Sequence, residues 1–464
     1  MDKNAIRRFA IYAREELIKR VTIQAATYGV TGKDDDAGAV NAGDRVFSPE
    51  EREWRGQLVR RVRRDGFEQV MEEVAYTWFN RFCALRFMEV NGYLPSRVRV
   101  FTDEANAFRP QMLAEALHLE LEGLDRERVL DLKGKNDNEA LYRYLLITQC
   151  NALAGVLPGL FQRLDAETSL LCPDNLLHED SVLAHLVADI PEEDWRDQVQ
   201  VIGWLYQYYN AVPKDMVFAA LKKNIKVSKE NIPAATQLFT PDWIVRYMVE
   251  NSLGRLWLEG HPDAALRAGW KYYLDEAEQE PAVAAELAKL RADRAALRPE
   301  EIRCIDPCMG SGHVLVYMFD VLMQIYRACG YPDREAVQSI VQNNLYGLDI
   351  DERAAQLAYF AVMMKAVQYD RRFLRRGVQP HVCAVPESAP LPEEAFAAFG
   401  EDADAARRLH AAFLDGKEYG SLTEPGVTLR EVSALRCRMR TFDAQAMKLD
   451  SLSDALDAVD ALSP

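Results

Sequence analysis

The stretch I-R-C-I-D-P-C-M-G-S-G-H-V-L, from Ile302 to Leu315, decides the fold that we expect for the second half of this chain. It reads as a short apolar strand that enters a glycine-containing turn and opens a helix. Gly310 and Gly312 permit backbone conformations and a close ligand approach that a Cβ atom would prevent, and the new helix offers free N–H groups. Asp306, at the end of the strand, could accept hydrogen bonds from a cationic amino group.

This turn differs from the two commonest phosphate-binding loops. The dinucleotide fingerprint G-x-G-x-x-G needs a third glycine, which Val or Leu replaces here, and an Asp-Pro pair precedes the turn. The G-K-[ST] sequence of a P-loop is missing as well. A lone G-x-G turn also occurs where glycine only relieves steric crowding, so this element alone leaves the ligand open.

A second element, N-N-L-Y-G-L-D-I-D-E, begins at Asn343 and reads as the next strand, ending in acids and followed by a helix. An acid at the end of the second strand of a parallel α/β sheet is placed to hold ribose hydroxyls. Asp349 is the better candidate, because Asp351 is explained as a helix N-cap or a first-turn acid. The long spacing between Asp306 and Asp349 is absorbed by an extra helix over 333–342.

A third element, Q-L-F-T-P-D-W-I-V-R-Y-M-V, begins at Gln237. Thr240 and Pro241 fit a helix N-cap followed by proline at the first helical position. We expect three side chains of this helix to face a core: Trp243, Ile244 and Met248.

Taken in this order, the three elements resemble the N6-adenine DNA methyltransferases of the type I and type IIG restriction-modification kind. The resemblance implies an α/β fold with a partial Rossmann-like sheet for S-adenosylmethionine (AdoMet), preceded by a mainly helical domain. In that family the turn cradles the methionine part of AdoMet, the acid at Asp349 holds the ribose, and the threonine at Thr240 helps to close the pocket. No metal is implied, and His313 is expected near the cofactor rather than as a base. The implied cofactor-binding residues are Thr240, Pro241, Asp306, Pro307, Gly310, Ser311, Gly312, His313, Asp349 and Ile350.

The resemblance extends to the PglX family of BREX phage-defence methyltransferases. The opening MDKNAIRRFAIYAREELI, the stretch E-E-V-A-Y-T-W-F-N-R-F-C-A-L-R-F-M-E from Glu72, and K-E-Y-G-S-L from Lys417 to Leu422 are similar in sequence and order. This implies an adenine-specific enzyme that flips its target base out of the duplex and transfers the methyl group of AdoMet to N6. Double-stranded DNA and other BREX defence proteins are the implied partners.

The sequence departs from that family in one respect. Its N-P-P-Y motif holds the amine of the target adenine, yet here no Asn is followed by Pro and no Pro-Pro pair occurs. We expect that motif and the DNA-recognition region to lie beyond Pro464, so that this chain holds the cofactor-binding half, carries no catalytic residue and is inactive alone. Two alternatives stay open: a non-catalytic AdoMet-binding or scaffold subunit of a defence complex, and a nucleotide-binding Rossmann protein of another reaction class.

The pattern along the chain indicates three parts. They are a helical N-terminal domain over 1–235, an AdoMet-binding core over 236–400 with a helical insertion at about 259–300, and a helical C-terminal segment over 401–464. A polar run over 222–237 marks the first junction. The acidic tail over 448–464 is expected to be marginally stable.

Composition narrows the class of protein further. The net charge of -16 is unfavourable for approaching a polyanion. One stretch nevertheless concentrates six arginines, which form either a solvated helix face or a phosphate-contacting stripe: Arg52, Arg55, Arg60, Arg61, Arg63 and Arg64.

The eight cysteines contain no C-x-x-C pair, which argues against a zinc cluster and a disulfide framework. No apolar stretch is long enough to span a membrane, so we expect a cytoplasmic protein.

Overall fold

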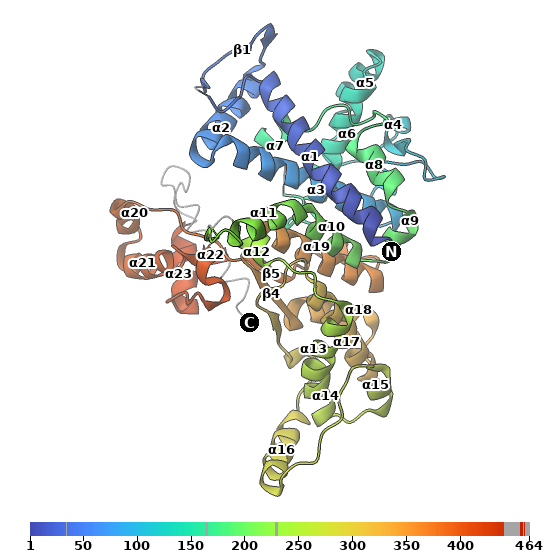
Figure 1. The fold of residues 1–464 in the computed structure, drawn as a ribbon, viewed down its shortest axis with the longest axis vertical. Helices are drawn as coiled ribbons and strands as arrows, with labels where there is room; N and C mark the ends of the chain where they lie inside the picture. Colours follow the sequence, from blue (N-terminus) through green and yellow to red (C-terminus); the bar gives the residue numbers. More distant parts are fainter. Residues whose placement is uncertain (34, 163–165, 228–230, 440–454, 458, 460–464) are drawn as a thin grey trace. The chain divides into compact units, whose positions relative to one another are not determined.

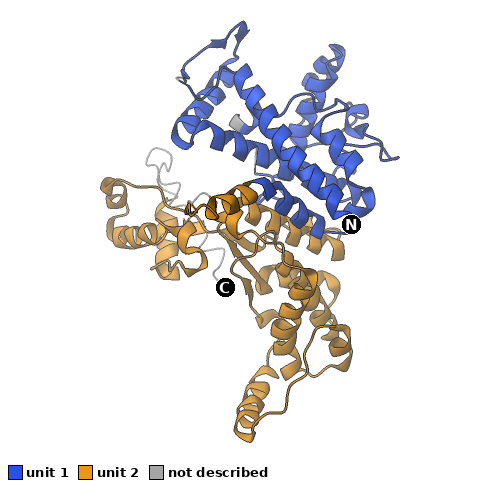
Figure 2. Cartoon of the chain, viewed as in Figure 1, with its two compact units in different colours: residues 1–212 blue, residues 213–464 orange. Residues whose placement is uncertain are grey.

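The computed structural model describes the chain except for residues 34, 163–165, 228–230, 440–454, 458 and 460–464. The described residues are mostly helical, with a three-stranded parallel sheet and a two-stranded antiparallel ribbon (Figure 1). The chain divides into two compact units, residues 1–212 and residues 213–464 (Figure 2). The three-part division expected from the sequence stays a prediction, and the acidic tail lies mostly outside the described residues.

Unit 1 is built around three helices: α1 (Lys3–Thr27), α3 (Phe67–Val90) and α10 (Gln200–Tyr209). Asp2 caps α1, because its side chain accepts the backbone N–H groups of Asn4 and Ala5. α1 packs along both α3 and α10, and the ring of Phe9 stacks on Phe79 with centroids 6.4 Å apart.

The helix α2 (Pro49–Asp65) carries the arginine-rich stretch. It starts from a capping box, in which Ser48 and Glu51 exchange side-chain and backbone hydrogen bonds, and it ends at Gly66. The connector before it contains a short ribbon that the sequence did not predict: β1 (Asn41–Ala42) and β2 (Arg45–Val46). The remaining helices of unit 1 are α4 (Gln111–Ala114), α5 (Arg126–Gly134), α6 (Asn138–Leu153), α7 (Ala166–Leu170), α8 (Val182–Asp189) and α9 (Glu192–Trp195).

The core of unit 1 contains a buried ion pair. Arg86 and Glu89 are one helical turn apart on α3, their side chains are fully buried, and they meet at 2.7 Å. Glu89 also accepts the backbone N–H groups of Val100 and Phe101 and the hydroxyl of Thr102. The carboxylate therefore organises the loop that follows α3.

Unit 2 contains the parallel sheet, in the order β3-β4-β5. Its strands are β3 (Cys304–Asp306), β4 (Leu345–Asp349) and β5 (His381–Ala384). The register pairs Asp306 with Gly347 and Asp349 with Ala384, so all three strands end at one edge of the sheet. The helices α17 (His313–Ala328) and α19 (Glu352–Tyr369) pack on each other and on β4.

The predicted succession of strand, turn, helix, helix, strand and helix is confirmed, whereas β5 was missed. The helices that precede this sheet in unit 2 are α11 (Ala211–Leu221), which begins at the unit boundary, α12 (Ile232–Thr236), α13 (Asp242–Val249), α14 (Arg255–Gly260), α15 (Ala264–Gly269) and α16 (Pro281–Arg294). The helix α18 (Asp333–Ser339) lies between β3 and β4 in the chain.

The helices after β5 build a core of their own at the end of the sheet. They are α20 (Glu393–Ala397), α21 (Ala403–Ala412), α22 (Gly416–Tyr419) and α23 (Leu429–Met439). Phe396, Leu409 and Phe413 pack there with Leu348 of β4 and with Val385, the residue after β5. The C-terminal helices are therefore fastened to the edge at which the strands end.

Candidate cofactor-binding site

The turn between β3 and α17 depends on two glycines in left-handed backbone conformations, Gly310 (φ 53°) and Gly312 (φ 81°). A Cβ atom on Gly312 would lie 3.0 Å from the Cα atom of Ala358 in α19, so this glycine permits close helix packing. A Cβ atom on Gly310 would meet no atom of the described residues within 4 Å. Gly310 is therefore required for the conformation of the turn, and its outer side is open.

Asp349 ties the end of β4 to this turn. Its Oδ2 atom accepts the backbone N–H of Gly310 at 2.8 Å, and its Oδ1 atom accepts that of Asp351 at 2.8 Å. Burial raises the pKa of Asp349, although both hydrogen bonds favour the ionised form. Each carboxylate oxygen keeps a free lone pair for a further donor.

Asp306 ends β3 beside the same turn and is 9% exposed. Its Oδ1 atom accepts the N–H of Cys308 at 3.2 Å, and burial raises the pKa of Asp306. Within the part of the chain that the structure describes, neither Asp306 nor Asp349 has a lysine or arginine partner. Two partly desolvated acids without a countercharge are typical of a functional site, because a protein gains no stability from holding them.

His313, the first residue of α17, faces the segment that leads into α13. Its Nδ1 atom lies 3.1 Å from the carbonyl oxygen of Thr240, and its ring stacks on Phe239 at a centroid distance of 4.4 Å. The Nε2 atom lies 4.0 Å from the carboxylate of Asp242. Burial lowers the pKa of His313. The side chain thus joins the third sequence element to the first.

The start of α13 corrects the sequence analysis. Pro241 occupies the N-cap position and the helix begins at Asp242, so Thr240 is not the N-cap. Val245 and Val249 form the buried stripe that packs on α17. Trp243 and Met248 are 54% and 50% exposed, and the expectation that they face a core is wrong. The physical reason is that this short helix buries only the stripe at i and i+4.

The remaining residues that were predicted to bind the cofactor lie around the turn between β3 and α17. Pro307 and Pro241 are exposed, Ser311 is buried, and Ile350 is half-buried at the end of β4. Asp351 caps α19 by accepting the N–H of Arg353, as predicted. The structure therefore gathers Asp306 to His313, Asp349 and Thr240 around the carboxyl edge of the sheet.

The arginine-rich stretch on α2 serves partly to hold unit 1 together. Arg55 is buried and donates to the carbonyl oxygens of Tyr28 and Gly29. Arg61 forms an ion pair with Glu73 at 2.9 Å. The exposed members are Arg52, Arg60, Arg63 and Arg64. Contact between these four and DNA stays a prediction.

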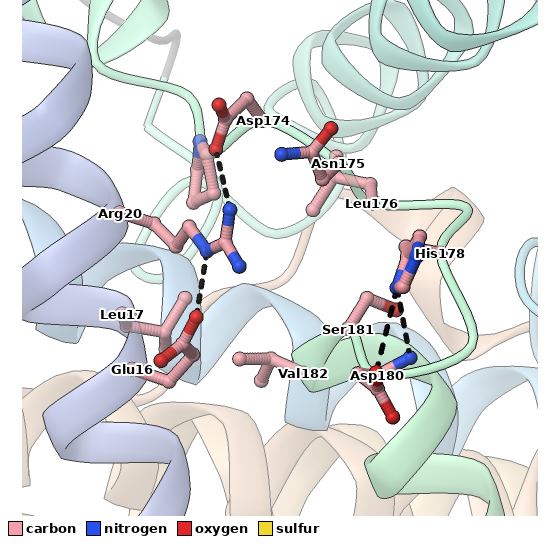
Figure 3. Close-up of a pocket in the computed structure, with 11 residues that line it drawn as sticks. Glu16, Leu17, Arg20, Asp174, Asn175, Leu176, His178, Asp180, Ser181 and Val182 are labelled. Carbon is pink, nitrogen blue, oxygen red and sulfur yellow. Dashed lines mark hydrogen bonds and ion pairs between the residues drawn. The ribbon is translucent and has the colours of Figure 1, made fainter.

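A small pocket in unit 1 is lined by α1 and the segment before α8 (Figure 3). Arg20 bridges Glu16 at 2.6 Å and Asp174 at 3.4 Å, and His178 accepts the N–H of Asp180. These groups pair with one another, so we assign no ligand to the pocket. Among the described residues, no cluster of His, Cys, Asp and Glu could hold a metal ion, and no helix is long and apolar enough to cross a membrane.

Comparisons with known proteins place the chain in a family. No family model matches it. It is 42% identical over 413 residues to the adenine-specific methyltransferase BrxX of Escherichia coli O9:H4 (strain HS), which covers 84% of this chain and 33% of BrxX. It is also 42% identical over 464 residues to the adenine-specific methyltransferase PglX of Lacticaseibacillus casei (strain Zhang), covering 91% of this chain and 38% of PglX.

A shorter match reaches a putative type II restriction enzyme and methyltransferase of Methanocaldococcus jannaschii, 32% identical over 153 residues, which is 30% of this chain and 13% of that protein. The chain spans about a third of the length of BrxX and PglX. The resemblance seen in the motifs is confirmed by this identity along most of the sequence. The chain belongs to the family of the adenine-specific methyltransferases BrxX and PglX.

Proposed function

We propose that this chain is the AdoMet-binding part of a BREX-type DNA methyltransferase that acts on adenine N6. One observation carries the proposal: Asp306 and Asp349 lie beside a two-glycine turn where parallel strands end, with no countercharge among the residues that the structure describes. Ligands of open α/β sheets bind outside the carboxyl ends of the strands. AdoMet is a suitable ligand, because it carries a cationic ammonium group and a sulfonium as well as a ribose diol.

Each residue of the site would bind a different part of AdoMet. Asp306 would hold the ammonium group, and the free lone pairs of Asp349 would accept the ribose hydroxyls. The N-terminus of α17, beside Gly312, favours the negative carboxylate of the methionine part. Thr240, held by His313, would close the pocket from the side of α13.

The topology supports the same proposal. A parallel β3-β4-β5 sheet with α17 and α19 packed on it is compatible with half of a Rossmann-like methyltransferase sheet. The names of BrxX and PglX support adenine as the target.

When bound, AdoMet supplies the methyl group, and the residues of this chain bind and orient it. No residue here is assigned to the target adenine, since the sequence has no Asn-Pro pair. We propose that the 464-residue chain alone does not methylate DNA. Tritiated methyl transfer to duplex DNA tests this, because incorporation by the isolated chain would contradict it.

Calorimetric titration with AdoMet tests the cofactor assignment, with NAD titrated in parallel. We expect AdoMet to bind and NAD not to bind. Asp306→Asn should weaken AdoMet binding by about ten- to a hundred-fold, the range for losing a charge-assisted hydrogen bond. If NAD binds and AdoMet does not, the chain is a Rossmann protein of another class. The chain can also be exchanged for the matching part of a full-length relative. If this chain binds AdoMet but the resulting protein transfers no methyl group to DNA, the chain is instead a scaffold subunit.

A further inference from the structure

The K-E-Y-G-S-L segment, from Lys417 to Leu422, has no role in the function proposed above. It forms the end of α22 and a 3-10 turn, η7 (Gly420–Leu422). The segment comes well after the last strand in sequence, yet η7 packs against β4. It therefore lies at the edge of the sheet where the candidate site is found.

Two glycines, four residues apart, bring this segment close to the ends of two strands. A Cβ atom on Gly416 would lie 2.3 Å from the carbonyl oxygen of Pro386, in the loop after β5. A Cβ atom on Gly420 would lie 3.2 Å from the Cγ2 atom of Ile350, the residue after β4. Gly420 also has a positive φ of 56°. Only glycine at both positions lets the backbone approach so closely.

The position of the segment is fixed from behind as well. The carbonyl oxygen of Phe413 accepts the N–H of Gly416 at 3.2 Å and that of Ser388 at 2.8 Å. The ring of Phe413 packs in the core that also contains Leu348 and Val385. These contacts fix the turn Tyr419–Leu422 in position against the ends of β4 and β5.

The side chains of this turn are left unusually open. Tyr419 is 60% exposed and Leu422 is 80% exposed, on either side of the glycine that contacts Ile350. A single exposed apolar residue needs no explanation. These two flank, in the chain, the glycine that lies against the half-buried Ile350 at the candidate ligand-binding edge of the sheet, and they offer apolar surface to a flat ring.

The strand order indicates which part of the cofactor lies there. In the proposed function the methionine part lies at the end of β3 and the ribose at the end of β4, so the adenine continues in the direction of β5. This is where Gly416 and Gly420 hold the turn. We propose that the turn Tyr419–Leu422 forms the adenine-side wall of the cofactor site, with Tyr419 and Leu422 contacting the purine beside Ile350. This inference rests on the proposed AdoMet function.

Titration of the full chain with AdoMet tests the wall. Tyr419→Ala and Leu422→Ser should each weaken AdoMet binding by about ten-fold, which lies within the lower half of the range for losing one stacking contact to a base. Gly420→Ala should weaken it too, because the added methyl group would displace Ile350. The matched control is Leu290→Ser, which removes a leucine that is 46% exposed on α16 and should bind like the wild type. Melting temperatures of all variants report whether they are folded.

The outcomes separate this inference from the function on which it rests. Weakened binding by folded Tyr419→Ala and Leu422→Ser, with Leu290→Ser unchanged, supports the adenine-side wall. If the wild type binds AdoMet and Asp306→Asn weakens it, but both wall variants bind normally, the wall is overturned and the proposed function stands. If the wild type binds no AdoMet, both are overturned.

Discussion

The Nδ1 atom of His313 lies 3.1 Å from the carbonyl oxygen of Thr240, a contact between residues 73 positions apart. A carbonyl oxygen can only accept, so Nδ1 carries the proton and donates it. The ring also stacks on Phe239, so it holds the Thr240 segment both by a hydrogen bond and by packing. His313 is therefore a positioning residue in the candidate site.

Two substitutions separate these contributions of His313. His313→Phe keeps a ring to stack on Phe239 but deletes the donor, whereas His313→Asn retains a donor near Nδ1 and deletes the ring. We expect His313→Phe to weaken AdoMet binding by about five-fold, in the range of one hydrogen bond, and His313→Asn to restore part of the loss. Hydrogen exchange of the amides over 237–242 should quicken in His313→Phe. Unchanged exchange and affinity in that variant would show that the contact positions nothing.

Asp306 should show a conflict between stability and binding. Burial raises the pKa of Asp306, so the folded state holds its proton more tightly than the unfolded state. Its contribution to stability is present at low pH and is lost as the pH rises through the raised pKa. At neutral pH, Asp306→Asn should therefore raise the melting temperature of the ligand-free protein by a few degrees while weakening AdoMet binding. Calorimetric melting across pH checks the sign: the gain should shrink in acid, and a lower melting temperature at neutral pH would contradict it.

The two glycines of the turn should respond differently to substitution. A Cβ atom on Gly312 would meet the backbone of α19, so Gly312→Val should destabilise unit 2 as well as abolish binding. Gly310→Ala meets open space and should cost about 1–2 kcal/mol of backbone strain. Chemical denaturation and AdoMet titration of both variants test this. Gly310→Ala is the more specific test of contact between the turn and AdoMet, because this variant should stay folded. If it binds AdoMet normally, the turn is not part of the cofactor site.

The buried pair on α3 should matter for stability alone. Glu89→Ala leaves the Arg86 guanidinium buried without its partner, and we expect a loss of about 3–5 kcal/mol in the free energy of unfolding. Replacing both residues, with Arg86→Met and Glu89→Leu, should cost less than Glu89→Ala alone. Urea denaturation followed by circular dichroism measures the losses. A double variant less stable than Glu89→Ala would show that the loop contacts of Glu89 outweigh the unpaired charge.

Local sequence rules predicted the elements that local interactions decide. The strand, the glycine turn and the helix around Asp306 follow from residue order, and so does the cap at Asp351. The missed features depend on contacts between distant segments. Nothing near Tyr419 indicates that Gly420 will meet Ile350, and nothing near Trp243 indicates which face of α13 packs on α17. The apolar run at β5 is a local strand signal, so this strand could have been predicted from the sequence.

Cys308 lies exposed in the turn that we assign to AdoMet. A sulfonium is an alkylating agent, and a thiolate at this place would compete with the substrate for its methyl group. Partial desolvation and the negative charges of Asp306 and Asp349 raise the pKa of the Cys308 thiol. The acids that would hold the cofactor thereby add to the desolvation that disfavours the nucleophilic thiolate form of Cys308. The same charges that would attract the methyl donor would therefore also disfavour methylation of this neighbouring sulfur.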